Sequence, residues 1–336
     1  MKYITPVPPG KAQGLVGDVY QQIKDDFGAV VDPFVVHSIS PPLLAAVWAA
    51  CRESELVGVV PRETKEAVAV AVSKRNRTPF CVDAHVIMLH ALKEHGVAQA
   101  ILDDRHERLP EQTQTILDWT TAKARSNGQA PPFTREAACE IIGTAVFFHY
   151  MNRIATVLFD DTPLPSSQRW LKPLLSRAAG WYFSFAARRP KTRGDSLGFL
   201  PDAALPADME WAAANETVAG AWARFAQEIE RQGQAALSAE TRNFAVEYIG
   251  EWDGDADELD RESIEVAIAQ LSPEQRSAVR LVVLTALAPH QVDEQVVRGF
   301  ADPAQAQEKL LGALAWASFT AARRIGSLLH RAATSH

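Results

Sequence analysis

Apolar residues recur at helical spacing along nearly the whole chain, and this pattern constrains the fold most strongly. Leu15, Val19 and Ile23 lie four residues apart, and Gly28 follows them as a helix stop signal. The same pattern predicts helices over residues 15–27, 42–50, 64–74, 78 to about 95, 111–124 and 134–158. The alternation typical of strands is scarce, and the β-branched residues at 68–72 are interleaved with alanines. We therefore expect an all-α protein.

Composition narrows the class of protein. The length of 336 residues suits one large domain or two of ordinary size, and the apolar and charged fractions are typical of a soluble globular protein. The net charge of −7 is spread along the chain, so no basic patch predicts a nucleic-acid partner. No apolar run is expected to span a membrane, and residues 1–6 lack the apolar core of a signal peptide. We expect a cytoplasmic protein with no membrane partner.

The cysteines argue against a disulfide framework and against a metal centre. Cys51, Cys81 and Cys139 are odd in number and widely spaced. No C-x-x-C pair and no Cys/His cluster with zinc spacing is present, and no glycine-rich phosphate loop indicates nucleotide binding. We expect no cofactor and no metal.

A weak internal sequence repeat suggests two copies of one helical unit. Residues 79–86 align with 289–296, residues 60–63 with 271–274, and residues 152–155 with 323–326, in the same order. Segments rich in proline, glycine or serine at 160–168 and 188–206 have linker composition, and 253–260 reads as an acidic loop. We therefore predict domains at 1–165 and 166–336. In the second copy Gln291 and Gln295 replace the thiol and the imidazole of the first.

The segment 77–85 holds the strongest candidate for chemistry. Thr78 and Pro79 are typical of an N-cap and a first helical residue, so Cys81 is predicted in the first turn, where the helix dipole favours a thiolate. His85 follows four residues later on the same helix face. Glu66 stands at the head of an apolar run, where a carboxylate is costly unless it is paired. Together these residues are the minimum for an activated cysteine.

Each of these residues also has a structural interpretation. A buried free cysteine usually behaves as a small hydrophobic residue, and an isolated histidine is more often a satisfied core residue than a base. Asp83 is more simply a partner of the helix dipole, and its recurrence as Asp293 supports a structural role.

The spacing of these residues resembles a known family. Eleven residues separate Glu66 from Thr78, two separate Thr78 from Cys81, and three separate Cys81 from His85. This spacing is similar to the core of the alkylhydroperoxidase D / carboxymuconolactone decarboxylase family. The resemblance implies a helical bundle in two tandem copies, the second degenerate, that forms a homo-oligomer without a tightly bound cofactor. It implies that Cys81 reacts with peroxide, that His85 is its base and that Glu66 relays protons, with Thr78 and Asp83 in support.

Two departures from the family pattern shape the functional hypotheses. Thr78 stands where reductases of this family have their first cysteine, and a threonine cannot form a disulfide. Cys51 and Cys139 are the remaining candidates for a thiol that resolves an oxidised Cys81. Phe80 makes the surroundings of Cys81 less polar, which would raise the pKa of the thiol.

Three functions stay open at this level. The first is a one-cysteine peroxidase restored by an external thiol or reductant protein. The second is a cofactor-free lyase or isomerase acting on a small carboxylate or lactone, with His85 and Glu66 as acid and base. The third is a non-catalytic helical scaffold.

Overall fold

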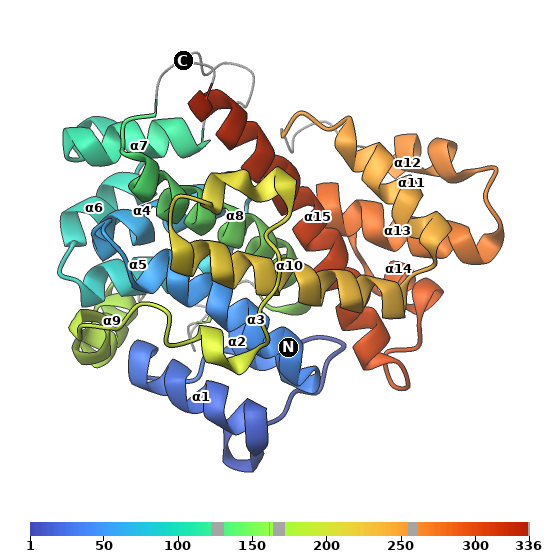
Figure 1. Ribbon diagram of the computed structural model, residues 1–336, viewed down its shortest axis with the longest axis horizontal. Coiled ribbons are helices and arrows are strands. Elements are labelled where there is room, and N and C mark those ends of the chain that lie inside the picture. The colour runs from blue at the N-terminus through green and yellow to red at the C-terminus, as the bar shows by residue number, and fades with distance from the viewer. Residues whose placement is uncertain (122–130, 161, 164–171, 255–260, 335–336) are drawn as a thin grey trace.

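A computed structural model describes residues 1–121, 131–160, 162–163, 172–254 and 261–334 (Figure 1). The prediction of an all-α fold is confirmed, since the described residues form helices and turns without strands. The α-helices are α1 (Gly14–Phe27), α2 (Asp32–Val35), α3 (Pro41–Cys51), α4 (Arg62–Arg75), α5 (Pro79–Ala91), α6 (His95–Leu102), α7 (Glu111–Thr121), α8 (Arg135–Leu158), α9 (Lys172–Arg188), α10 (Glu216–Ala236), α11 (Ala239–Gly250), α12 (Arg261–Ile268), α13 (Pro273–Leu287), α14 (Glu294–Phe300) and α15 (Gln307–Thr334).

The six predicted helices correspond to α1, α3, α4, α5, α7 and α8, with one clear error of length. The helix predicted to run to about residue 95 ends at Ala91, because Lys93 adopts a left-handed φ of 71° that a helix cannot continue through. Gly96 is consequently inside α6 and is not a stop signal. The predicted end of the 111–124 helix lies outside the described residues.

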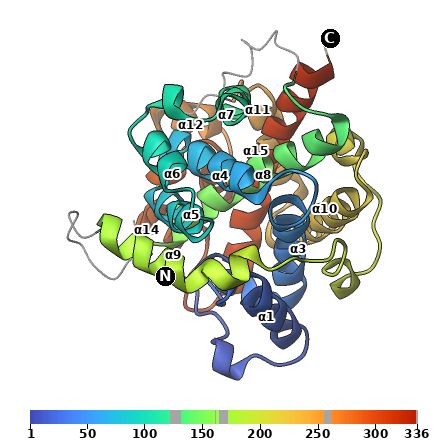
Figure 2. The same ribbon diagram turned by 90° about the vertical axis from the view of Figure 1, so that its left-hand side faces the viewer.

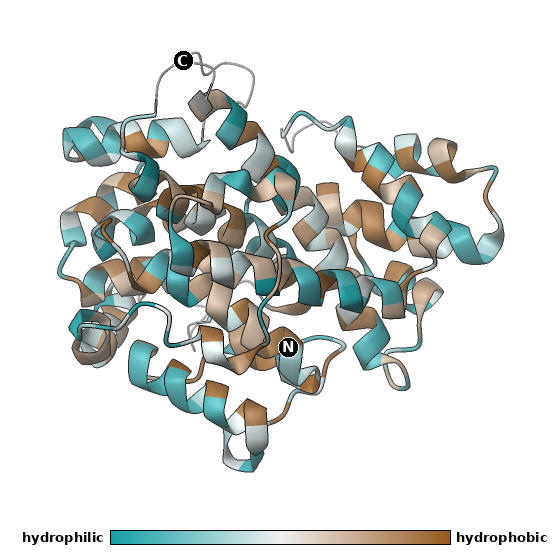
Figure 3. Ribbon diagram, in the orientation of Figure 1, coloured by the Kyte–Doolittle hydropathy of each residue, from teal (hydrophilic) through white to brown (hydrophobic). Residues whose placement is uncertain are grey.

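Helix α8 is the centre of the fold, and it packs against α4 and α15 (Figure 1). By length and composition α8 is apolar enough to cross a membrane, which the sequence analysis did not anticipate. However, 94% of its most apolar window is buried inside the protein, as expected for a core helix. On the outer helices the pattern differs: Figure 3 shows hydrophilic and hydrophobic residues alternating along α1 and α10.

The two halves of the chain share one continuous hydrophobic core. The last helices of the two halves, α8 and α15, lie side by side. The counterpart of Cys81, Gln291, lies in a 3-10 turn (Pro289–Gln291), and α14 starts only after Asp293, whose side chain caps it. The predicted domain boundary at 165/166 and most of the predicted acidic loop lie outside the described residues, so the division into domains stays a prediction.

A π-helical turn, Arg52–Leu56, continues α3 and leads to the loop before α4. This loop is anchored by the buried carboxylate of Glu140 on α8, which accepts the backbone N–H groups of Val59 (2.8 Å) and Val60 (2.9 Å). Lys65 Nζ donates to the same carboxylate at 3.0 Å. The buried charge is therefore neutralised and hydrogen-bonded, and it fixes the path from α3 to α4.

Gly58 in this loop is predicted to be indispensable for stability. Its φ is +126°, and a Cβ placed there would lie 2.0 Å from Glu140 Oε1. We expect Gly58→Ala to lower the free energy of unfolding by about 3 kcal/mol, because it strains the backbone and displaces a buried carboxylate. Chemical denaturation measures this loss. Gly10→Ala, where a Cβ meets nothing within 4 Å, is the control, and equal effects for the two variants would contradict the prediction.

Candidate active site

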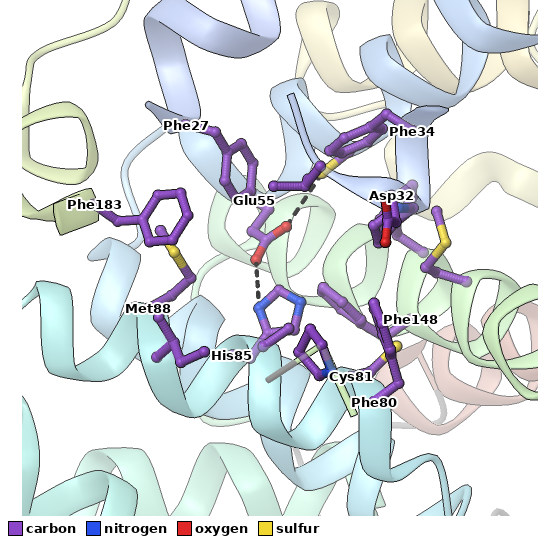
Figure 4. A pocket seen from close by; sticks show the side chains of 18 of the residues that line it. Phe27, Asp32, Phe34, Glu55, Phe80, Cys81, His85, Met88, Phe148 and Phe183 are labelled. Atoms are coloured by element: carbon purple, nitrogen blue, oxygen red, sulfur yellow. Dashed lines mark hydrogen bonds and ion pairs between the residues drawn. The ribbon is translucent and has the colours of Figure 1, made fainter. Parts of the chain in front are cut away.

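The predicted site lines a cavity of about 400 Å³ walled mainly by helices α5, α8 and α9 and by residues 27–34, which include the start of α2 (Figure 4). Phenylalanine rings form much of its surface (Phe27, Phe34, Phe80, Phe147, Phe148 and Phe183). The turned view in Figure 2 shows α9 lying on the same side as α5, and α9 closes the cavity with Ala179 and Phe183. Among the described residues, few polar groups reach this apolar space: Asp32, Cys51, Glu55, Cys81 and His85.

The structure brings together two of the predicted residues and places the third nearby. His85 Nδ1 lies 2.7 Å from Glu66 Oε2, and the other oxygen of Glu66 accepts from Arg62 Nε at 3.1 Å. Cys81, the third residue of α5, is buried and lines the cavity with His85. Glu66 is not part of the cavity wall. No hydrogen bond joins Cys81 to His85 among the described residues, so His85 is oriented by carboxylates in this structure.

Glu55 is the site residue that sequence reasoning missed. Figure 4 shows the carboxylate of Glu55 pointing toward His85, and its Oε1 is 3.4 Å from His85 Nδ1. Cys51 Sγ donates to the other oxygen, Oε2, at 3.2 Å. Unlike Glu66, Glu55 faces the cavity. Its 1% exposure and the lack of a hydrogen-bond partner for Oε1 mark it as a costly buried group.

The burial of Glu55 could not be predicted from the sequence, because a polar run such as 52–55 normally indicates a solvated turn. Here the whole run is buried, and neighbouring groups supply its partners. Arg52 donates to Asp26 and Glu53, each at 2.7 Å, and Ser54 Oγ accepts from Trp222. The local feature of the structure that marks Glu55 as a candidate functional residue is the π-helical turn, which is often found at functional sites.

The pKa values of the three buried acid–base groups, Glu55, Glu66 and His85, are shifted by burial and by one another. Burial and the charge of Glu66 raise the pKa of Glu55 to about 7. Burial opposes ionisation of Glu66 as well, but its bond to His85 and the charge of Arg62 hold its pKa below the usual range. Burial alone would lower the pKa of His85, and the charges of Glu55 and Glu66 outweigh it and raise that pKa. These groups titrate as a coupled set.

The thiol does not behave as the helix position predicted. Burial, and to a smaller extent the charge of Glu55, raises the pKa of Cys81 far above its usual range. The expectation that the start of the helix favours a thiolate is therefore wrong for this site, because desolvation exceeds the effect of the helix dipole. The expectation that apolar surroundings such as Phe80 raise the pKa of the Cys81 thiol agrees with the direction of this shift. Ionisation of Cys81 consequently needs a base in the cavity.

Thr78 and Asp83 are structural. Thr78 is the N-cap residue of α5, as predicted, but its hydroxyl caps no backbone N–H; it donates to Asn76 O (3.4 Å) and lies 3.3 Å from Thr156 Oγ1. Asp83 lies beyond the first turn, so it is not the predicted dipole partner. Its carboxylate accepts from Lys172 Nζ (2.8 Å) and so ties α5 to α9.

Two further observations concern sulfur and metal. Cys51 lines the cavity, whereas Cys139 is buried on α8, donates to a backbone carbonyl and is not in the cavity wall. Glu55, Glu66 and His85 place ligand atoms within 4.8 Å of one another, close enough to hold a metal ion. The guanidinium of Arg62, bonded to Glu66, adds a positive charge that would repel one.

Comparison with known proteins gives one extended match. The chain is 36% identical over 333 residues to an alkyl hydroperoxide reductase of Mycobacterium tuberculosis, covering 99% of this chain and 96% of the relative. A crystal structure from Ralstonia eutropha JMP134, described as an alkylhydroperoxidase AhpD core of an uncharacterized peroxidase-related protein, is 21% identical with a TM-score of 0.41. It covers 52% of this chain and 95% of its own. No protein-family model matches the sequence.

Proposed function

Because it matches the mycobacterial alkyl hydroperoxide reductase over almost the full length of both chains, this chain belongs to the alkylhydroperoxidase D-like family, and we propose that it reduces hydroperoxides with Cys81 as the reacting thiol. The main support from the site is that one cavity wall carries Cys81 together with His85 and Glu55. Its apolar surface suits an organic hydroperoxide with a hydrocarbon substituent.

In the proposed reaction, the Cys81 sulfur attacks the distal oxygen of the hydroperoxide. The S–O bond forms as the O–O bond breaks, giving a sulfenic acid on Cys81 and an alcohol. His85, held by Glu66, takes the thiol proton. Glu55, which faces the cavity and stays protonated up to about pH 7, donates a proton to the leaving oxygen. One proton is taken and one is given, so the step is balanced.

Restoration of the thiol requires a second sulfur. Thr78 cannot supply it, and its side chain lies outside the cavity of Cys81. We propose that an external thiol attacks the sulfenic acid, releasing water and forming a mixed disulfide, which a second external thiol then reduces. A small-molecule thiol or a reductant protein fits this role, and free thiols at all three cysteines suit the reducing cytoplasm.

Peroxide treatment followed by mass spectrometry tests this proposal. With an organic hydroperoxide and a sulfenic-acid trap, we expect modification at Cys81 and none at Cys139, which lies outside the cavity. The detection of a Cys51–Cys81 disulfide would replace the external thiol by an internal one. A folded protein whose Cys81 stays unmodified would rule out thiol-based reduction.

A second candidate is cofactor-free proton transfer on a small carboxylate or lactone. One observation favours it: the acid–base groups are well placed, whereas the raised pKa of Cys81 weakens it as a nucleophile. Glu55 and His85 would then exchange protons with the substrate directly. Removal of the thiol separates this candidate from the first.

We also propose that the protein forms a homo-oligomer through α9. The outer face of this helix exposes Leu174 (66%), Trp181 (81%), Tyr182 (63%) and Phe185 (81%). Large apolar residues grouped on one helix face indicate an interaction surface. Sedimentation velocity on the full-length protein is the direct check.

A further inference from the structure

A second pocket, of about 270 Å³, lies where the two halves of the chain meet. The first half contributes the end of α4, the residue before α5 and one face of α8, and the second half contributes residues 287–290. Thr78 lines this pocket, whereas Phe80 and Cys81 line the cavity of the candidate active site. The start of α5 therefore separates two different sites.

The most unusual group in this pocket is the guanidinium of Arg153. The residue is only 5% exposed, and no carboxylate among the described residues pairs with it. Nε donates to Ala286 O and Nη1 to His149 O, each at 2.6 Å, and the group lies over the ring of Trp252. Burial lowers the pKa of Arg153 to about 10, with no acidic neighbour raising it. A buried charge of this kind is costly unless a counter-ion reaches it.

Other donors lie in the same wall. Asn152 is 1% exposed, and although its Oδ1 accepts from Ser73, its Nδ2 has no hydrogen-bond partner. The hydroxyls of Thr78 and Thr156 line the pocket, and α5 starts there without a side-chain cap. Arg75 and Arg77 add two positive charges to the wall. Among the described residues that line it, the pocket has no carboxylate.

We propose that this pocket binds the phosphate group of a small molecule, with Arg153 and Asn152 as its principal buried contacts. The remaining N–H groups of the Arg153 guanidinium and the amide of Asn152 match the oxygens of a phosphate group, and the anion supplies the missing counter-charge. The uncapped start of α5 adds a favourable dipole. The pocket is larger than a free phosphate requires, which favours a phosphate monoester. This site is distinct from the peroxidase cavity and does not depend on the function proposed for it.

Calorimetric titration of the full-length protein with inorganic phosphate and with glycerol phosphate, at constant ionic strength, tests the proposal. We expect saturable binding that is at least tenfold weaker in Arg153→Gln. Because that substitution is in the core, His290→Glu provides a second test: His290 is exposed at the pocket rim, and a carboxylate there should repel the ligand by a similar factor. Arg298→Gln, which removes an exposed arginine from α14, is the control for net charge.

The two ligands distinguish the source of the phosphate group. Tighter binding of glycerol phosphate supports a phosphate monoester, and equal or tighter binding of inorganic phosphate supports the free anion. The absence of saturable binding for both ligands overturns the proposal. So does binding of unchanged affinity in Arg153→Gln and His290→Glu variants that remain folded by circular dichroism.

Discussion

Replacing Cys81 with serine is expected to reduce the rate of hydroperoxide reduction by at least about 10³-fold, because a hydroxyl is a far weaker nucleophile toward the O–O bond. The residue is buried in the wall of an apolar cavity, and serine is close to it in size, so the fold and the cavity should be retained. The measurement is consumption of an organic hydroperoxide with an excess of a small dithiol as reductant. Circular dichroism checks that the variant is folded.

The other two cysteines provide matched controls for this experiment. Cys139→Ser should leave the rate unchanged, since Cys139 lies on α8 outside the cavity. Cys51→Ser should also retain turnover with an external dithiol, and a large loss would identify Cys51 as a resolving thiol. If Cys81→Ser itself kept full turnover on a carboxylate or lactone substrate, proton-transfer chemistry would replace the thiol mechanism.

The sequence predicted the fold well because helical periodicity is a local signal. The predicted starts of α1, α3, α4 and α8 lie close to the observed ones, because apolar spacing along the chain marks them. The end of α5 did not follow, because the left-handed conformation of Lys93 has no marker in its residue type. Glycine or asparagine would have indicated it, and lysine does not.

In the candidate site, too, local features could be predicted from the sequence and features that depend on distant segments could not. The contact between Glu66 and His85 was predictable because a carboxylate in an apolar run needs a partner and the family spacing supplies one. The place of Glu55 in the site was not predictable, because its burial depends on a π-helical turn packed under α8 and α10. The pKa of Cys81 was misjudged for a related reason: the sequence shows the helix start, but the surrounding rings that desolvate the thiol are assembled from distant segments.

Glu55 and Glu66 are expected to affect stability with opposite signs. Folding raises the pKa of Glu55 from 4.5 to about 7, so its contribution is fully present below pH 4.5 and is lost as the pH rises to about 7. Folding lowers the pKa of Glu66, so its contribution is present above pH 4.5 and is lost on acidification. At pH 8, Glu55→Gln should therefore raise the free energy of unfolding, and Glu66→Gln should lower it, each by on the order of 1–3 kcal/mol.

The same pair of variants tests the proposed proton transfer. If Glu55 protonates the leaving oxygen and unprotonated His85 takes the thiol proton, kcat/KM of the natural protein passes through a maximum: the ascending limb reflects His85, whose pKa is raised, and the descending limb reflects the loss of the Glu55 proton at about pH 7. Glu55→Gln should lower the rate at pH 6 by about 10²–10⁴-fold and remove that descending limb. Glu66→Gln should lower the rate because His85 loses its support, and it should keep the descending limb but move it to lower pH, because the charge of Glu66 no longer raises the pKa of Glu55. Because denaturation and kinetics are measured on the same proteins, a loss of activity in Glu55→Gln with a gain of stability at pH 8 separates a chemical role from a structural one. Equal pH profiles in both variants would contradict the assignment of Glu55 as the acid.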